Sequence, residues 1–425
     1  MKIAIVGTGI AGNVAAHRLH AAGHDITVYE AGGRVGGHTQ THEIEHDGEV
    51  HAIDTGFIVF NDRTYPNFVA LLDELGVPSQ ASSMSFSVRN DASGLEYNGT
   101  SLDGLFAQRR NILRPGFHRM IADILRFHRE APQLLRRDGP EIPLGDWLEA
   151  NGFRGRFVAD YLVPMGAAIW STDPQRMFAF PVRFFVRFLH NHGMLTVNDR
   201  PQWRVVRGGS ARYVEKLVAP WRDRIRLHCP VEAVRRLPHG VQVKARGCEP
   251  AMFDHVFLAC HSDEALALLA DPSRAEREIL GAIPYQRNEA VLHTDTSLLP
   301  RTRRAWAAWN YHVLPGANEG AALTYNMNIL QGLPSRHTFC VTLNASHHID
   351  ERKVLRTMVY HHPLFTPAGV AAQARHSEIS GVRGTHYCGA WWRFGFHEDG
   401  VASALEAVRI FDEVIDAQCA LPRVA

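Results

Sequence analysis

Three glycines near the start of the chain have the spacing of a phosphate-binding loop, Gly7-x-Gly9-x-x-Gly12. They follow the apolar, β-branched run 2–6 and precede the helix-like segment 13–19. In such a loop the first glycine permits a tight turn, the second lets a pyrophosphate approach the backbone, and the third lets the helix pack on the strand. The free N–H groups at the helix N-terminus would then bind phosphate oxygens.

An acidic residue ends the next predicted strand. Residues 25–29 form a second β-branched run, and Glu30 follows it directly. A carboxylate there can accept hydrogen bonds from both hydroxyls of an adenosine ribose, and it would repel a 2′-phosphate. Strand, loop, helix and acidic strand end together predict a dinucleotide site in which NADP is disfavoured; a glycine-rich turn without a ligand is the alternative.

The segment after Glu30 distinguishes FAD from NAD. Arg34-x-Gly36-Gly37 resembles the second dinucleotide motif of the flavin amine oxidase and phytoene desaturase superfamily. The resemblance implies that FAD is the cofactor and that these three residues line its pyrophosphate and ribityl side. The superfamily usually continues with arginine, whereas this chain has His38, a change that weakens one phosphate contact.

Three later segments extend the resemblance. Residues 54–57 are similar to a short turn near the flavin, 225–234 to a strand whose backbone meets the adenine, and 385–404 to a late strand and a helix start facing the flavin pyrimidine ring. Backbone N–H groups of that helix would stabilise negative charge on the reduced ring. Ala390 stands where the superfamily commonly has an acid. The residues expected to contact FAD are Gly7, Gly9, Ile10, Ala11, Gly12, Glu30, Ala31, Arg34, Gly36, Gly37, His38, Thr55, Gly56, Phe57, Val231, Gly389 and Val401.

Length and composition describe an ordinary globular protein. With 425 residues, 45% of them hydrophobic, the chain is long enough for two domains. A net charge of +1 argues against a nucleic-acid partner. Six scattered cysteines without a CxxC pair suggest a cytoplasmic protein, and we expect neither a signal peptide nor a membrane span. The doublets His347-His348 and His361-His362 lack the surrounding ligands of a recognised metal site, so no metal is predicted.

The predicted fold class is α/β, with a Rossmann-like FAD-binding domain plus a substrate domain that has an antiparallel sheet and a helical insert. The resemblance implies that the FAD-binding domain is discontinuous and is formed by residues 1–80, 203–283 and 382–425. Residues 81–202 and 284–381 would form the substrate domain.

The substrate domain is expected to have two parts, an antiparallel sheet at about 287–345 and a helical insert at about 102–200. Alternation of apolar and polar residues predicts strands at 289–294, 305–313, 321–329 and 338–343. Within the insert, 105–137 carries eight arginines against two acidic residues, and 180–190 repeats this basic and aromatic mixture. Such a surface could contact anionic lipid headgroups; a lid with its apolar face buried and its arginines solvated is the alternative.

The cofactor carries the hydride chemistry, so the residues around it must select the substrate. Amine oxidases of the resembled superfamily usually have an aromatic cage and often a lysine near flavin N5. Here Phe396 stands where a cage tyrosine is expected, and no lysine has a convincing position. This favours an apolar substrate, unless Phe396 serves only core packing. Further pocket candidates are Trp391, Trp392, Tyr325 and Asn326; at most one tryptophan is expected to face the flavin, and Asn326 could instead cap a loop.

Three functions compete at this point. The first is a desaturase, which would pass a hydride to flavin N5 from an activated position of a fatty acyl or phospholipid chain. The second is a flavin amine oxidase producing hydrogen peroxide, which an acidic pocket residue such as Glu289 or Glu319 would favour. The third is a non-catalytic FAD-binding redox protein. The expected partners are a hydrophobic small molecule or lipid substrate and, as a further hypothesis, an anionic membrane surface that the protein would bind peripherally at its inner face.

Overall fold

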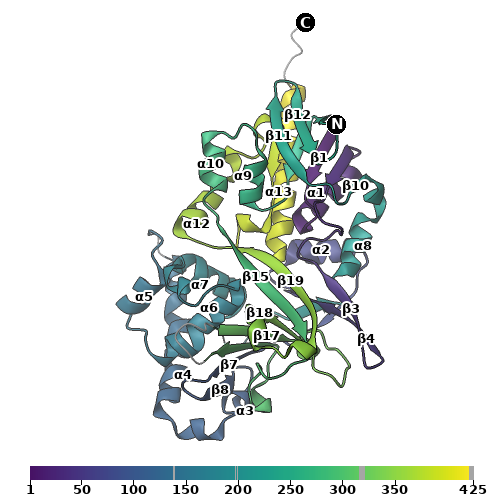
Figure 1. The fold of residues 1–425 in the computed structure, drawn as a ribbon. Helices are drawn as coiled ribbons and strands as arrows, with labels where there is room; N and C mark the ends of the chain where they lie inside the picture. The colour runs from purple at the N-terminus through teal and green to yellow at the C-terminus, as the bar shows by residue number, and fades with distance from the viewer. Residues whose placement is uncertain (137–138, 197, 199, 315–320, 421–425) are drawn as a thin grey trace.

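The computed structural model describes residues 1–136, 139–196, 198, 200–314 and 321–420 (Figure 1). Its strands are β1 (Lys2–Val6), β2 (Asp25–Tyr29), β3 (Thr41–His46), β4 (Glu49–Asp54), β5 (Val59–Asn61), β6 (Ser79–Ala81), β7 (Phe86–Asn90), β8 (Leu95–Asn98), β9 (Trp203–Val206), β10 (Ile225–Arg226), β11 (Val231–Leu237), β12 (Gly240–Ala245), β13 (Ala251–Phe253), β14 (His255–Leu258), β15 (Tyr285–His293), β16 (Trp309–Val313), β17 (Ala321–Asn326), β18 (Cys340–Leu343), β19 (Val354–Pro363) and β20 (Thr385–Tyr387). Its α-helices are α1 (Ile10–Ala21), α2 (Pro66–Glu74), α3 (Leu102–Leu105), α4 (Pro115–Glu130), α5 (Leu144–Ala150), α6 (Val163–Trp170), α7 (Val182–Asn191), α8 (Ala211–Val218), α9 (Ser262–Leu268), α10 (Arg274–Leu280), α11 (Met327–Leu330), α12 (Pro367–Gln373) and α13 (His397–Ala420).

A five-stranded parallel sheet lies in the half of the molecule that contains the N-terminus (Figure 1), with the strand order β10-β2-β1-β14-β20. Every neighbouring pair in it is parallel. Its strands come from segments that lie far apart in the chain, because β14 and β20 are separated by more than a hundred residues. The predicted α/β class with a Rossmann-like sheet is confirmed.

Both faces of this sheet are covered, which explains why β1 is a continuous apolar run. Ile3 and Ile5 pack with helices α1, α8 and α13, whereas Ala4 and Val6 pack with strands β11 to β13 and helices α9 and α10. A strand buried on both faces has no solvent side and therefore shows no polar alternation. The loops at the carboxyl ends of β1 and β2 hold the glycines and Glu30 of the predicted dinucleotide site.

A second, seven-stranded sheet has the order β19-β15-β18-β17-β16-β7-β8. The long strands β15 and β19 run from the parallel-sheet half into this sheet (Figure 1). The sheet was predicted to be antiparallel, but β16 pairs with β7 in parallel, so it is mixed. Strands β7, β8 and β19 were not predicted at all.

Two predicted strands are shorter than the sequence pattern suggested. The strand expected over 305–313 begins at Trp309, because a 3-10 turn occupies 303–305. The strand expected over 321–329 ends at Asn326, and helix α11 follows it. The side chain of Asn326 accepts a hydrogen bond from the Ile329 N–H, which is the usual way an asparagine starts a helix.

Helices α3 to α7 lie between β8 and β9 in the chain and pack against the seven-stranded sheet (Figure 1). Helix α7 buries Val182, Phe184, Phe185, Val186, Phe188 and Leu189, and α4 buries Phe117, Met120 and Phe127. The apolar faces of both basic segments are thus largely turned inward, as the lid alternative expected. Among the described residues, no helix has the length and apolar character needed to cross a bilayer.

Candidate flavin site

The turn between β1 and α1 uses its glycines in two different ways. A Cβ added at Gly12 would lie 2.0 Å from the Gly7 carbonyl oxygen, so this glycine allows the helix to pack on the strand. A Cβ added at Gly9 would meet nothing within 4 Å. Gly7 itself has φ +101° and donates its N–H to the Tyr29 carbonyl at 2.8 Å. The backbone at Gly9 is therefore open to a ligand, next to the first N–H groups of α1, at Ile10 and Ala11.

Glu30 lies at the carboxyl end of β2, beside this turn. Its carboxylate accepts the backbone N–H of Thr8 at 3.0 Å and that of Gly32 at 2.7 Å, and also the Thr8 hydroxyl. The Glu30 carbonyl accepts the Cys229 N–H, which places the segment before Val231 against it. Val231 is buried at the start of β11, and Ala31 is exposed. The carboxylate is thus held at the edge of the turn, where a ribose would be bound.

The loop that contains Arg34, Gly36 and Gly37 folds back onto the first turn. Gly36 donates its N–H to the Thr8 carbonyl at 2.9 Å, and a Cβ at Gly37 would lie 2.8 Å from the Gly9 Cα atom. Both glycines have positive φ values, +114° and +57°. The Arg34 guanidinium donates to the carbonyls of Gly37 and Thr39 at 2.6 and 2.9 Å and remains exposed. The two sequence motifs therefore form one glycine-lined surface.

The turn at Thr55, Gly56 and Phe57 packs against the same loop. A Cβ at Gly56 would lie 1.9 Å from the His38 carbonyl oxygen, which also accepts the Phe57 N–H at 3.0 Å. The Thr55 hydroxyl bonds the Tyr360 hydroxyl at 2.9 Å. Only glycine allows this approach of two backbone segments.

A buried carboxylate, Asp54, stabilises the start of this turn. It accepts the Ser210 N–H at 2.9 and 3.1 Å and the Thr41 hydroxyl at 2.5 Å. Burial raises the pKa of Asp54 to about 6, while these hydrogen bonds oppose the rise. Asp54 links strand β4 to the loop before α8 and so fixes the start of the turn at 55–57.

The start of helix α13 meets the start of helix α1. A Cβ at Gly400 would lie 2.5 Å from the Ile10 Cγ2 atom, and Val401 is buried beside it. Gly389 precedes a turn in which its N–H donates to the Ser403 hydroxyl at 2.9 Å. Two helix N-termini with their positive dipole ends thus converge at one place, which suits a ligand with a pyrophosphate and an electron-accepting ring.

The first turn of α13 carries buried polar side chains. The His397 ring stacks on Phe57 with 3.6 Å between centroids, and its Nε2 bonds the Tyr213 hydroxyl at 2.7 Å. Desolvation holds the pKa of His397 well below its usual value. Asp399 accepts the Phe396 N–H at 2.9 Å, and burial raises the pKa of this carboxyl to about 7. These contacts fix the turn that precedes the helix.

Phe396 belongs to an aromatic group that links this turn to the helical insert. Its ring stacks on Phe188 of α7 with a centroid separation of 4.8 Å. Phe184 of the same helix contacts Phe394 at 4.7 Å, and the Trp170 indole donates to the Phe394 carbonyl at 3.2 Å. The surface beside Phe396 is therefore apolar and aromatic.

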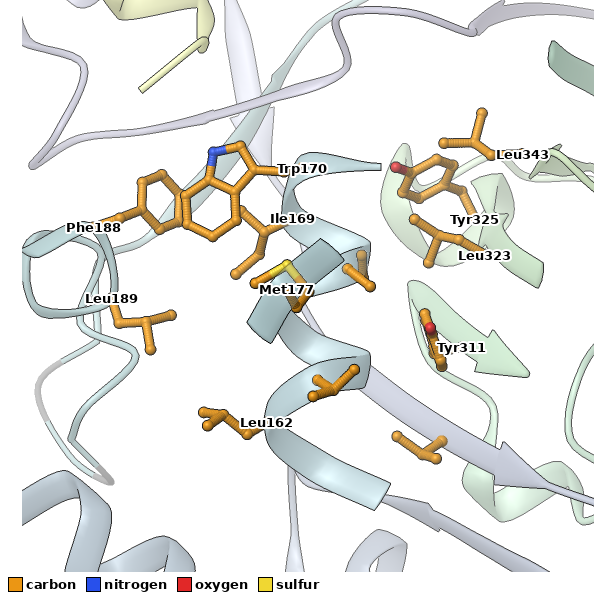
Figure 2. Close-up of a cluster of buried hydrophobic side chains, with 14 of the residues drawn as sticks. Leu162, Ile169, Trp170, Met177, Phe188, Leu189, Tyr311, Leu323, Tyr325 and Leu343 are labelled. Atoms are coloured by element: carbon orange, nitrogen blue, oxygen red, sulfur yellow. The ribbon is translucent and has the colours of Figure 1, made fainter. Parts of the chain in front are cut away.

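The other pocket candidates have structural contacts. Trp391 and Trp392 are 3% and 7% exposed and pack in the core beneath β14 and β20; the Trp391 indole donates to the Cys260 carbonyl at 3.1 Å. Asn326 caps α11, as described above. Tyr325 lies in the cluster of Figure 2, with Leu323 and Leu343 on the strands across from Ile169 and Trp170.

Further histidines lie around His38. Its ring lies 5.5 Å from that of His362 and 6.0 Å from that of His261, and its Nε2 bonds the His361 carbonyl at 3.1 Å. His38 and His362 keep some exposure, yet desolvation lowers their pKa values to about 3 and about 4. The sequence analysis noted His38 as an expected FAD contact and the doublet at 361–362 as lacking metal ligands, but nothing in the sequence brought them together.

One group of residues elsewhere has metal-ligand chemistry. The ligand atoms of His46, Asp47 and His337 lie within 4.8 Å of one another at the β3–β4 turn. His337 Nε2 lies 3.2 Å from the Asp47 carboxylate, so this direct side-chain contact accounts for their proximity.

Comparison with known proteins identifies what this site is similar to. The family model for flavin containing amine oxidoreductases matches residues 10–298. The chain belongs to this family. Membership confirms the predicted superfamily and its FAD cofactor and places the chain among FAD-dependent oxidoreductases. The residues fit FAD, because the open backbone at Gly9, the two converging helix N-termini and Glu30 offer donors and acceptors where a dinucleotide needs them.

Relatives of known sequence and structure agree with the family. AofH of Mycobacterium tuberculosis, a flavin-containing monoamine oxidase by name, is 27% identical over 282 residues, which is 64% of this chain and 59% of AofH. The chain thus matches less than two thirds of that relative's length. Cyclohexylamine oxidase from Brevibacterium oxydans shares the fold with a TM-score of 0.73, at 16% identity, over 97% of this chain and 99% of that one. A fatty acid isomerase from P. acnes shares it with a TM-score of 0.69, at 16% identity, over 96% and 98%.

Proposed function

We propose that the protein uses FAD to dehydrogenate an apolar substrate at an activated position of a fatty acyl or phospholipid chain. The observation that carries this proposal is the aromatic group around Phe396, in which Phe396 packs on Phe188 where a cage tyrosine was expected. When bound, FAD supplies the hydride acceptor. The chain's own residues exclude water and orient the substrate. Because an isolated methylene is a poor hydride donor, the reacting C–H must be activated by a neighbouring double bond or branch.

The lysines of the chain support a substrate other than a charged amine. They are Lys2, Lys216, Lys244 and Lys353. Lys216 donates to the carbonyls of Leu75 and Gly76, Lys353 pairs with Asp295 at 3.4 Å, and Lys244 lies 3.9 Å from Glu232. Lys2 lies over the Phe253 ring. Each lysine is thus engaged away from the Phe396 surface.

Glu289, one of the two acidic residues that would favour an amine substrate, points away from the histidine group. Glu289 follows Asn288 on β15, and successive side chains of a strand point to opposite faces. Since Asn288 contacts His362 of the histidine group, Glu289 lies on the other face. Glu319 lies outside the described residues. An amine oxidase remains the second candidate, because AofH and cyclohexylamine oxidase carry such names. A non-catalytic flavoprotein is the third.

Exposed apolar side chains in the insert support contact with a lipid surface. Leu102 and Leu113 are 77% and 86% exposed, and Ile112 and Leu125 are about half exposed. Ile112, Leu113 and Leu125 lie among the arginines of segment 105–137, and Leu102 lies just before it. A basic surface with exposed leucines is suited to anionic headgroups. The name of the P. acnes fatty acid isomerase, which shares this fold, supports an acyl substrate.

The test uses the FAD-loaded protein under anaerobic conditions. It is mixed with phospholipids that carry unsaturated or methyl-branched chains, and separately with primary amines, while the visible flavin absorbance is followed. We expect bleaching by lipid and a new double bond by mass spectrometry. Phe396→Tyr, which places a hydroxyl against the acyl chain, should slow this bleaching about tenfold without loss of FAD. Bleaching by amines alone would overturn the proposed lipid substrate and support an amine oxidase. Bleaching by neither would favour the non-catalytic protein.

A further inference from the structure

A relay of side-chain amides leads from the helical insert to the histidine group. Gln286 and Asn288 lie on one face of β15, and His362 lies on β19, where it pairs with Gln286. The Asn288 side chain is fully buried and its Nδ2 contacts His362 Nδ1 at 2.7 Å. An asparagine can present either its oxygen or its nitrogen to an imidazole, so the protonation of His362 depends on which way this amide points.

Two backbone groups decide that orientation independently. The Ser171 carbonyl can only accept, so the atom of Gln286 that meets it at 3.1 Å is the amide nitrogen. The same nitrogen donates to Asn288 Oδ1 at 3.0 Å. The Glu289 N–H can only donate, so it meets the Asn344 oxygen at 2.9 Å, and the Asn344 nitrogen donates to the same Asn288 Oδ1 at 2.7 Å. Asn288 therefore presents its N–H to His362.

This arrangement selects one tautomer of His362. Its Nδ1 must accept from Asn288, so the proton of the neutral ring lies on Nε2. Desolvation, followed by the charges of His261 and His361, lowers the pKa of His362 to about 4 and keeps the ring neutral near pH 7. The Nε2–H has no hydrogen-bond partner among the residues that the structure describes. His362 is thus an oriented donor without an acceptor.

The position of His362 relates it to both parts of the flavin site. Its ring lies 5.5 Å from that of His38, which directly follows Gly37 of the pyrophosphate loop. The next residue, Pro363, approaches to 3.4 Å a Cβ added at Gly395, the residue before Phe396. His362 therefore lies between the phosphate-binding loop and the turn before α13, the two parts of the chain that are expected to contact FAD.

We propose that the Nε2–H of His362 donates a hydrogen bond to the electron-rich edge of the bound flavin ring, at a carbonyl oxygen or ring nitrogen that gains negative charge on reduction. A donor fixed before reduction needs no reorganisation, so it stabilises the reduced cofactor more than the oxidised one. The titratable groups around it are His38, His261 and His361, with Arg34 beside His38 and Glu264 beside His261. The inference rests on FAD binding and not on the proposed substrate.

The test measures the two-electron midpoint potential of the FAD-loaded protein without any substrate, so it is separate from the test of the proposed function. His362→Leu removes the donor and should lower the equilibrium constant for flavin reduction about tenfold, or about 30 mV. His362→Gln, which retains an N–H, should lie closer to the unchanged protein. His361→Leu is the matched control: it changes the neighbouring, exposed ring, leaves the backbone carbonyl that binds His38, and should leave the potential unchanged.

A second variant tests the relay itself and serves if His362→Leu does not fold. Asn288→Asp replaces the donor to Nδ1 with an acceptor, so Nδ1 must carry the proton of the neutral ring. The Nε2–H is then lost, and the potential should fall as it does in His362→Leu. Equal potentials for the unchanged protein and His362→Leu at full FAD occupancy would overturn the proposal. An unchanged potential in Asn288→Asp would do the same.

Discussion

Gly9 and Gly12 lie three residues apart and have opposite surroundings, so the same substitution should fail for different reasons. In Gly12→Ala the new methyl group meets the Gly7 carbonyl at 2.0 Å. We expect the apoprotein to lose about 1–3 kcal/mol of unfolding free energy from overpacking. In Gly9→Ala nothing lies within 4 Å, and φ is −65°, which alanine adopts readily. The apoprotein should keep its stability, while the methyl group occupies the space of the pyrophosphate and lowers FAD affinity at least about tenfold.

Chemical unfolding of both apoproteins and FAD titration followed by flavin fluorescence separate the two effects. An apoprotein of Gly9→Ala that is destabilised as much as Gly12→Ala would show that Gly9 serves packing. Undiminished FAD binding by Gly9→Ala would place the pyrophosphate elsewhere.

At the residue scale the sequence predicted the local motifs and missed the assembled ones. The glycines at 7, 9 and 12 are recognisable because the turn and the close helix–strand packing require glycine at this fixed spacing. His362 is not, because its role depends on Asn288, seventy-four residues away, and on the register between β15 and β19. Asn326 was expected on a strand as a pocket candidate, with capping of a loop as the alternative. In the structure it caps helix α11, because its side chain accepts the Ile329 N–H.

Among the elements, the 102–113 segment before α4 has the most exposed apolar side chains of the insert. Leu102→Asp with Leu113→Asp should abolish most binding to anionic phospholipid vesicles, at least about fivefold in flotation, because it removes apolar contact and adds repulsion. Since both side chains are mostly exposed, thermal stability should change little.

Val50→Asp is the matched control for that pair. Val50 is 67% exposed on β4, outside the insert, and its substitution should leave vesicle binding intact. Equal binding by the leucine pair variant and the unchanged protein would show that this surface does not contact lipid.

At the element scale the sequence located strands better than it paired them. The strand near 289–294 was found from its alternation, but β19 was not, since it lies at the sheet edge and its run Val354–Pro363 includes exposed positions on both faces. The parallel pairing of β16 with β7 joins segments about 220 residues apart. Alternation specifies the buried face of a strand and not its neighbour.

For the whole molecule, desolvated histidines should determine stability in mild acid. Desolvation lowers the pKa values of His38, His128, His192, His293, His362 and His386 to between about 3 and about 4. Below pH 6.5 the unfolded chain binds protons at these rings and the folded chain does not, so stability falls on acidification. Asp54 and Asp399, with raised pKa values of about 6 and about 7, act oppositely, because their ionisation destabilises the folded state as pH rises.

Six histidines outweigh two carboxyls over the interval from pH 6.5 to 5. The thermal midpoint of the apoprotein should therefore fall by about 5 °C or more between pH 7 and pH 5 in scanning calorimetry. An equal or higher midpoint at pH 5 would show that the buried carboxyls dominate.

The way the parallel sheet is assembled has a consequence for synthesis in the cell. The phosphate-binding loop is complete within the first forty residues, but β20 and the start of α13, which meets Ile10, are encoded near residue 400. At about 5–20 residues per second, the ribosome needs roughly 20–80 seconds to add them. Until then β14 lacks its neighbour β20, and the nascent chain has a nucleotide loop that cannot yet retain its flavin.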